Sequence, residues 1–84
     1  MYSIRVKRSA AKQLEKLPPK AAERIVKAID ALAEDPRPDG VKKLQGTDDH
    51  YRIRIADYRV IYSIEDQHLI VEVVKVAHRK DVYK

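Results

Sequence analysis

Three arginines, Arg52, Arg54 and Arg59, are the residues in this chain whose spacing most clearly suggests chemistry. Apolar and polar residues alternate on both sides of Ala56-Asp57, which predicts two strands joined by a tight turn. In that register Arg54 faces Arg59, and Arg52 shares their face. Like charges directly opposite each other destabilise a strand pair, and guanidinium groups bind phosphate oxygens bidentately. The pattern indicates either a preformed phosphate site or a solvated face whose charges splay apart.

A phosphate site of this kind can serve RNA cleavage. That reaction needs a base for the 2′-OH proton, cations for the charge developing on phosphorus, and an acid for the 5′-O leaving group. Arg79 can add charge to the three hairpin arginines, but arginine is a poor proton acceptor because its pKa lies above about 12. The groups left for proton transfer, besides carboxylates, are the tyrosines, His50, His68 and His78.

His78 is the best placed of these histidines, and Tyr83 is the tyrosine of greatest interest. The unperturbed pKa of Tyr83 is near about 10, so surrounding arginines would have to lower it, or its ring stacks on a base of single-stranded RNA. The structural alternatives are a strand-end role for His78 and a C-terminal anchor for Tyr83. His50 and His68 lie beside turns, and we expect them to be exposed.

The composition limits what else the protein can be. The chain has 84 residues, 18 Lys and Arg against 13 Asp and Glu, and a net charge of +5. A small basic domain often meets nucleic acid or an acidic protein. It has no cysteine and no histidine pair at metal-ligand spacing, so we expect no metal site and no cofactor. No apolar run reaches the about 18 residues of a membrane span, and we expect one cytoplasmic domain over residues 1–84.

The elements that position these residues can be read from the periodicity. Residues 2–7 predict a half-buried strand, and Ser9 is expected to cap a short helix over residues 10–17. Pro19 suits the first position of a second helix over residues 19–34, packed against the first as an αα-hairpin. The apolar stripe expected on this second helix comprises Ala22, Ile25, Val26, Ile29 and Leu32.

The second half of the chain predicts a sheet. Residues 41–46 indicate a short edge strand, and the β-branched run over residues 68–77 indicates a central one. The expected fold class is α+β in the order β-α-α-β-β-β: an N-terminal strand, an αα-hairpin, then an antiparallel three-strand meander. The helices should cover one face of the sheet, and the arginines should lie on the other.

Three segments, residues 43–46, 51–62 and 76–83, resemble the RelE branch of the RelE/ParE toxin superfamily in sequence, order and spacing. The resemblance implies a RelE-like toxin of a type II toxin–antitoxin pair. RelE-like members enter the ribosomal A site and cleave the bound mRNA without a metal. Attack by the 2′-OH leaves a 2′,3′-cyclic phosphate, and translation stops.

The resemblance also assigns roles to individual residues. Arginine stands at positions 52 and 54 where the best-known members have lysine, so the identity of the base stays open. Arg79 falls on the arginine proposed to protonate the leaving group. For Arg79 to reach the hairpin arginines, the last strand must bend or bulge after Val76. The implied catalytic residues are Arg54, Arg59, Arg79, Tyr83 and His78, and the implied RNA- or phosphate-binding residues are Arg52, Lys43 and Lys80.

The implied partners are an acidic, RelB-like antitoxin, the ribosome and mRNA. We expect no membrane association, no small-molecule cofactor, and no direct DNA binding except through the antitoxin. Two alternatives use the same fold: a ParE-like inhibitor of DNA gyrase without nuclease activity, and an inert antitoxin-binding module. Lys42 and Lys43 can also be read as solubilising charge.

Overall fold

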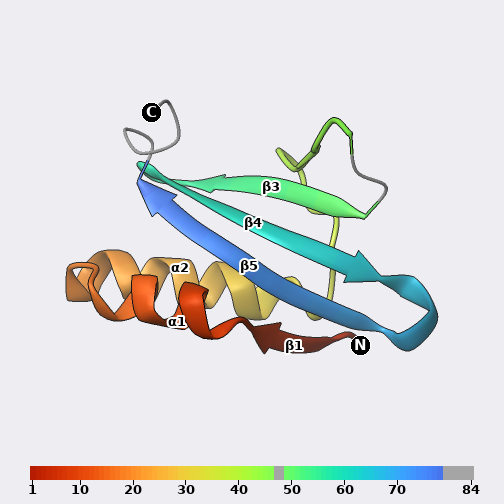
Figure 1. The fold of residues 1–84 in the computed structure, drawn as a ribbon, viewed down its shortest axis with the longest axis horizontal. Helices are drawn as coiled ribbons and strands as arrows, with labels where there is room; N and C mark the ends of the chain where they lie inside the picture. The colour runs from red at the N-terminus through yellow and green to blue at the C-terminus, as the bar shows by residue number, and fades with distance from the viewer. Residues whose placement is uncertain (47–48, 79–84) are drawn as a thin grey trace.

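The computed structural model describes residues 1–46 and 49–78, which form a five-stranded sheet with two helices on one of its faces (Figure 1). The strand order is β1-β5-β4-β3-β2; β1 pairs with β5 in parallel, and the other neighbours are antiparallel. This confirms the α+β class and the three-strand meander. The elements are β1 (Ser3–Val6), α1 (Arg8–Glu15), α2 (Pro19–Ala31), β2 (Lys42–Lys43), β3 (His50–Ile55), β4 (Tyr58–Glu65), η1 (Asp66–His68) and β5 (Ile70–His78).

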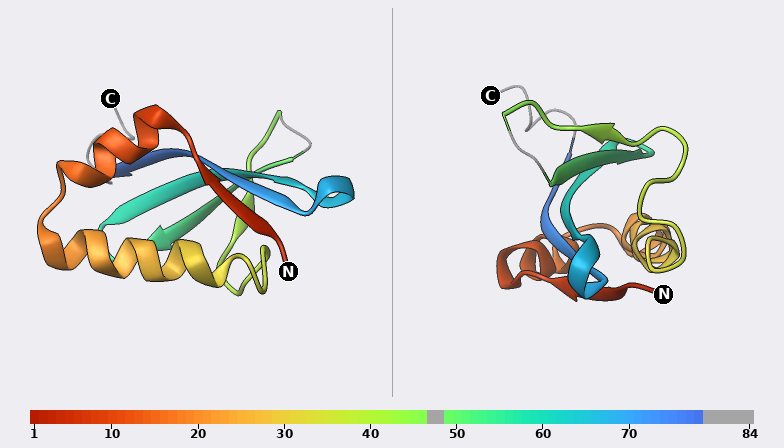
Figure 2. Two further views of the ribbon diagram at one scale, coloured as in Figure 1. Left: turned by 90° about the horizontal axis from the view of Figure 1, so that it is seen from below. Right: turned by 90° about the vertical axis from the view of Figure 1, so that its right-hand side faces the viewer.

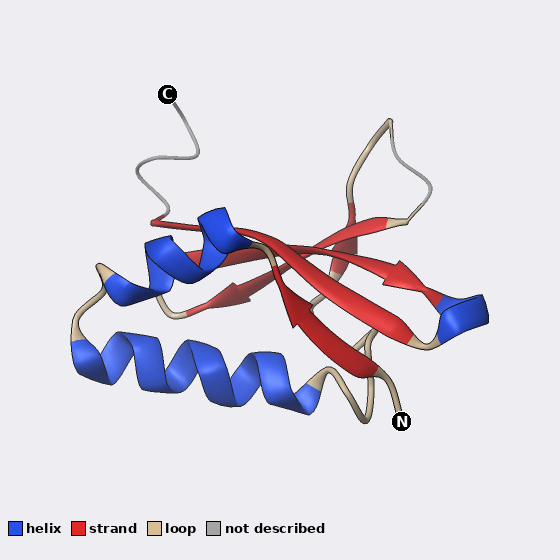
Figure 3. Cartoon of the chain, turned by 60° about the horizontal axis from the view of Figure 1, so that its bottom comes forward, coloured by secondary structure: helices blue, strands red, loops and turns tan. Residues whose placement is uncertain are grey.

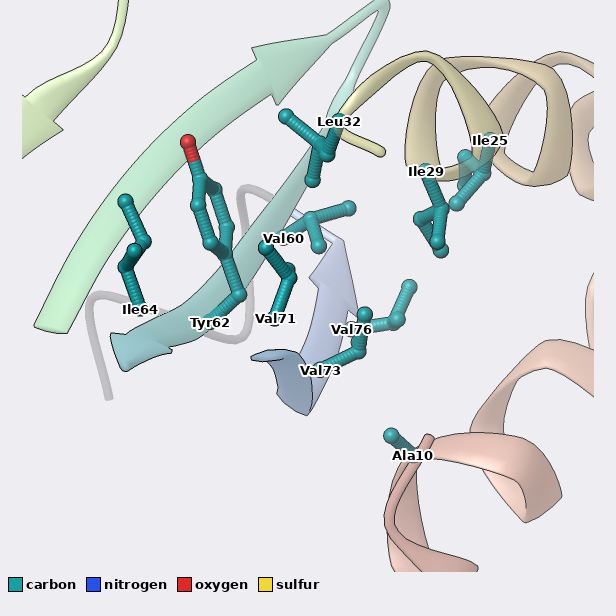
Figure 4. Packing of buried hydrophobic residues seen from close by; sticks show 10 residues of the cluster. All are labelled: Ala10, Ile25, Ile29, Leu32, Val60, Tyr62, Ile64, Val71, Val73 and Val76. Carbon is teal, nitrogen blue, oxygen red and sulfur yellow. The ribbon is translucent and has the colours of Figure 1, made fainter. Parts of the chain in front are cut away.

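The two helices run in opposite directions across the same face of the sheet (Figures 2 and 3). Helix α1 packs on β5 and helix α2 packs toward β3. Within the described ranges, no helix has the length and apolar character needed to span a membrane. The core lies between the layers (Figure 4) and comprises Ala10, Ile25, Ile29, Leu32, Val60, Tyr62, Ile64, Val71, Val73 and Val76.

The helix boundaries correct two expectations. Helix α1 begins at Arg8, so Ser9 lies inside its first turn and the predicted Ser9 cap is wrong. The backbone of Lys7 is extended, and its carbonyl already accepts the N–H of Ala11 at 2.9 Å. Pro19 is confirmed as the start of α2. That helix ends at Ala31 rather than at position 34, because the following residues bond three positions back instead of four.

Val26 is also not part of the buried stripe. Its side chain is 43% exposed, whereas Ile25 and Ile29 are almost fully buried. Adjacent positions on a helix point about 100° apart, so the same contact with the sheet cannot bury both Ile25 and Val26. Ile25 makes this contact with the sheet, and Val26 does not.

The β3–β4 hairpin has the predicted register. The pairs Ile55 with Tyr58 and Arg54 with Arg59 flank the turn, and the alternation continues along both strands. Ala56, the first turn residue, has a positive φ of 53°. A two-residue connection needs such a backbone to match the twist of its strands.

Strand β5 lies between β1 and β4, as expected for an interior strand, but its bulge is not where we predicted it. Tyr62 pairs with Val73, yet the adjacent Ile61 pairs two positions further along β5, which leaves Val74 as an extra residue. The side chains that face the helices therefore shift from odd to even positions, and Val76 points into the core. The expectation of a bend after Val76 is wrong, because the change of face has already occurred at Val74.

A cluster of polar side chains lies at the end of the sheet away from the β3–β4 turn. The buried Tyr62 hydroxyl donates to the carbonyl of Pro36 at 2.8 Å, and burial raises the pKa of Tyr62 to about 12. Arg37, the residue after Pro36, forms an ion pair with Asp66 at 2.9 Å, and the Tyr2 hydroxyl donates to the same carboxylate at 2.6 Å. The bonds from Arg37 and Tyr2 hold the pKa of Asp66 below its usual range.

Candidate functional site

The three hairpin arginines gather on the sheet face that the helices leave uncovered. Arg54 pairs with Arg59, and Arg52 lies two residues earlier on β3. Their apolar neighbours Ile53 and Val60 pair on the opposite face and contribute to the core. The predicted separation of faces is therefore confirmed, since the alternation of each strand carries the arginines away from the helices.

A small basic pocket lies among these side chains. It has a volume of about 150 Å³ and is lined by Gly40, Lys42, Arg52, Arg54 and Arg59. We call it the arginine pocket. Pockets for drug-sized ligands run from about 300 to 1,000 Å³, so this one suits a single small anionic group.

The lysine of the arginine pocket is not the one expected. In β2, Lys42 pairs with Arg52 and Lys43 pairs with Tyr51. Because successive strand residues point to opposite faces, Lys42 reaches the pocket and Lys43 does not. A two-residue strand is too short for its register to be read from alternation, so sequence reasoning missed Lys42.

The pocket concentrates positive charge. Among the described residues, no carboxylate lines it, and four of its five lining residues are cations. Arg54 is exposed, whereas Arg59 is only 9% exposed and so holds its charge almost buried in the sheet. Opposed guanidinium groups repel each other, and an anion bound between them relieves that repulsion.

Comparison with known proteins identifies the family. Residues 4–83 match the model of the ParE toxin of type II toxin–antitoxin systems, parDE. The chain belongs to the RelE/ParE toxin family. Toxin RelG of Mycobacterium tuberculosis is 33% identical over 87 residues, which cover 99% of this chain and 97% of RelG.

Solved structures place the chain in the RelE branch. The archaeal RelE–RelB complex of Pyrococcus horikoshii contains a chain with a TM-score of 0.84 and 34% identity, covering 93% of this chain and 94% of that one. A chain of the intact Escherichia coli RelBE toxin–antitoxin complex has a TM-score of 0.81 and 29% identity, covering 93% and 96%. The RelE-like fold expected from the sequence is thus confirmed.

For a RelE-like toxin, the arrangement of the possible proton-transfer groups is informative. His78 pairs with Tyr58, and the two rings meet edge to face at 5.2 Å on the helix side of the sheet. The structure therefore does not bring His78 to the arginine pocket. The cause is the bulge at Val74, because it places every later residue of β5 on the face opposite to the one that simple alternation predicts.

The other histidines lie at the ends of elements. His50 is on the arginine face at the start of β3, 2.9 Å from the carboxylate of Asp49, and it does not line the pocket. His68 contacts Glu65 at 2.6 Å beyond the far end of β4. The remaining predicted site residues, Arg79, Lys80 and Tyr83, lie outside the described residues. Within the described ranges the arginine pocket can bind and neutralise a phosphate, but no histidine, tyrosine or carboxylate lines it.

Proposed function

We propose that this RelE-family toxin is a ribosome-dependent endoribonuclease that cleaves mRNA in the A site without a metal ion. The observation that carries the proposal is the arginine pocket, where Arg54 faces Arg59 and Lys42 and Arg52 complete a site without a carboxylate among the described residues. A scissile phosphodiester is a small anion of the kind that this site suits. Such an activity places the protein in the cytoplasm.

The chemistry divides between charge and proton transfer. The ribose 2′-oxygen attacks phosphorus and gives up its proton, the bond from phosphorus to the 5′-oxygen breaks, and that oxygen takes a proton. The products are a 2′,3′-cyclic phosphate and a 5′-hydroxyl. Arg54 and Arg59 stabilise the charge that develops on the phosphoryl oxygens, while Arg52 and Lys42 hold the adjacent backbone. We assign the leaving-group proton to Arg79 and substrate positioning to Tyr83, and leave the base open.

Dependence on the ribosome agrees with a pocket that suits phosphate yet has no histidine, tyrosine or carboxylate among its described lining residues. A ribosome that fixes the mRNA can supply orientation, which contributes a large share of many catalysed rates. We also propose a RelB-like antitoxin as partner, since the P. horikoshii and E. coli structures are of toxin–antitoxin complexes.

The experiment is primer extension on a defined mRNA in a purified translation system, with and without ribosomes. We expect new 3′ ends inside the A-site codon only when ribosomes are present. Arg54→Ala should lower the cleavage rate by about 100-fold, a typical loss for one group that stabilises transition-state charge. Arg5→Ala is the matched control, because Arg5 pairs with Glu72 on the same face of the sheet, at its far edge.

A second candidate is inhibition of DNA gyrase, which the match to the ParE family model favours. Intact mRNA together with accumulating cleaved gyrase–DNA complexes would establish that function. If neither effect appears, the chain is an antitoxin-binding module without activity.

A further inference from the structure

One row of residues crosses the open face of the sheet, the face without helices, from β2 to β5. The strand pairings place in it, in this order, Lys42, Arg52, Ile61 and Lys75. Lys42 and Arg52 line the arginine pocket, whereas Ile61 and Lys75 lie beyond it. We call this the cross-sheet row. It continues the basic surface from the pocket toward β5, and the resemblance to RelE-like toxins assigns no role to Ile61 or Lys75.

The bulge at Val74 brings Lys75 to this face. Val73 and Val76 both lie in the core between the sheet and the helices (Figure 4). In a strand without the extra residue, alternation would place Lys75 on the helix side together with Val73. With the bulge, Lys75 is opposite Ile61 and is exposed. Bulges beside active sites commonly change the direction of a side chain, and this one adds a cation to the cross-sheet row.

The charge of Lys75 is available to a ligand. Lys75 forms no ion pair within residues 1–46 and 49–78. The only carboxylate of β5 is Glu72, which pairs with Ser63 and Arg5 and so lies in the next row of the same face. Lys75 also borders a groove beside α1, because β1 ends opposite Val73 and leaves this part of β5 at the edge of the sheet. An anion on the open face can therefore reach the ammonium group.

Ile61 provides an apolar surface between two cations. Its side chain is half-buried, and its neighbours in the row are Arg52 and Lys75. Because adjacent strands lie about 4.8 Å apart, the backbones of Arg52 and Lys75 are separated by about 10 Å, and their long side chains can shorten the span. Single-stranded nucleic acid is bound by cations along its backbone and by apolar or aromatic surfaces beneath its bases. The cross-sheet row has this alternation.

We propose that Ile61 and Lys75 form a subsite for the nucleotide that adjoins the scissile phosphate. With the scissile phosphate in the arginine pocket, the ribose and base of this nucleotide lie over Ile61, and its other phosphate binds the Lys75 ammonium. The inference rests on the proposed function, which puts the scissile phosphate in that pocket. Lys75 binds and orients the mRNA across the sheet and takes no part in proton transfer.

The test measures kcat/KM for cleavage of a defined mRNA on ribosomes. Lys75→Gln removes the charge and should lower kcat/KM by about 10-fold, a typical loss for one hydrogen bond to a charged group. Lys75→Arg should restore most of it. Arg5→Gln is the matched control, because it removes one charge from the same face outside the cross-sheet row, and it should stay within about 2-fold of the wild type.

Ile61→Ala tests the apolar half of the subsite. The smaller side chain keeps every charge and should lower kcat/KM by about 3-fold to 10-fold, because it offers less apolar surface to the nucleotide. Circular dichroism melting curves identify any variant that is not folded.

Changing the mRNA identifies the group that Lys75 binds. A neutral methylphosphonate replaces the phosphate on the 5′ side of the scissile one in one mRNA, and the phosphate on its 3′ side in another. At one of these two positions the replacement should slow the wild type by about 10-fold. The same replacement should not slow Lys75→Gln further, because both changes remove the same contact.

The outcomes separate the subsite from the proposed function. If the wild type leaves the mRNA intact on ribosomes, the proposed cleavage fails and the subsite fails with it. If the wild type cleaves and Lys75→Gln cleaves as fast as Arg5→Gln, the subsite alone is overturned. It is also overturned if Lys75→Gln is slow but responds to both methylphosphonates as the wild type does, since Lys75 would then contribute only general charge.

Discussion

Arg54 and Arg59 form a like-charged pair that lowers the stability of the hairpin. They face each other across β3 and β4, and like charges in that position destabilise the strand pair. We predict that Arg54→Gln raises the free energy of unfolding by about 0.5 kcal/mol, as measured by urea denaturation in a phosphate-free buffer. Added inorganic phosphate should raise the Tm of the wild type and leave that of the variant unchanged. Equal phosphate effects on both proteins would mean that the anion binds elsewhere.

Tyr62, in contrast to the Arg54–Arg59 pair, stabilises the fold. Its buried hydroxyl donates to the Pro36 carbonyl at 2.8 Å, so Tyr62→Phe should lower the free energy of unfolding by about 1 to 2 kcal/mol at pH 7. Since the folded-state pKa is about 12 and the ordinary value is 10.0, the Tyr62 contribution is complete below pH 10 and is lost as the pH rises toward 12.

This loss of stabilisation with rising pH is tested by urea denaturation of the wild type and of Tyr62→Phe. The measurements run from about pH 8 to pH 11.5, values within about two units of the tyrosine pKa. The difference in stability between wild type and Tyr62→Phe should shrink as the pH rises. A difference that stays constant would show that the hydroxyl contributes no titrating interaction. Tyr51→Phe is the control, because the Tyr51 ring stacks on that of Tyr62.

At the scale of elements, the β3–β4 turn contains a strained position. Ala56 has a φ of 53°, a region that only glycine enters without steric cost. Ala56→Gly should therefore stabilise the protein by about 0.5 to 1 kcal/mol, measured as a shift of the urea midpoint with an unchanged m-value. Lowered stability would show that the entropy which glycine adds to the unfolded chain exceeds the relief of strain.

The bulge at Val74 tests the arrangement of β5. Deleting Val74 removes the extra residue and leaves a regular ladder, in which Tyr62 still pairs with Val73 and Ile61 with Lys75, so Val76 stays in the core. We expect the Tyr58–His78 ring contact to persist in NMR spectra and the stability to fall by less than about 3 kcal/mol. Val74→Ala keeps the residue count and should cost less than about 1 kcal/mol. A deletion variant that loses the ring contact would contradict this reading of the bulge.

These elements also show where reading the sequence succeeds. The hairpin register was predictable because the alternation over two strands leaves one pairing that puts Ile53, Val60 and their apolar neighbours on one face and the three arginines on the other. The position of the bulge was not, since residues 73–76 are mostly apolar and conceal any change of face. Lys42 was missed because β2 has two residues, and its register depends on the loops around it.

At the scale of the whole molecule, charge is unevenly placed. Residues 7–27, which contain α1 and most of α2, carry seven Lys and Arg against two Glu, so they account for the entire net charge of +5. The rest of the chain, the arginine pocket included, is neutral in sum. The total charge of the chain does not reveal this difference between residues 7–27 and the rest. The helical layer is thus positioned to guide the protein toward a polyanion.

We predict that Lys12→Glu/Lys27→Glu lowers association with ribosomes at low salt by about 10-fold, measured by co-sedimentation over about 50 to 200 mM salt. The wild type should also lose affinity steeply over this range, whereas the variant should respond less. Cleavage per bound toxin should stay the same, because neither lysine lies near the arginine pocket. A variant that binds normally but cleaves slowly would place these lysines in the reaction.

The parallel pairing of β1 with β5 has a consequence for how the protein is made. The first and last strands of the described chain are neighbours, and α1 packs on β5, so the N-terminal third has no sheet to rest on until residues 70–78 have been synthesised. Contacts so distant in sequence form late, and a chain emerges from the ribosome N-terminus first. The arginines leave the ribosome before the strand that completes their support. It follows that the sheet which carries the arginine pocket is complete only after β5 has left the ribosome.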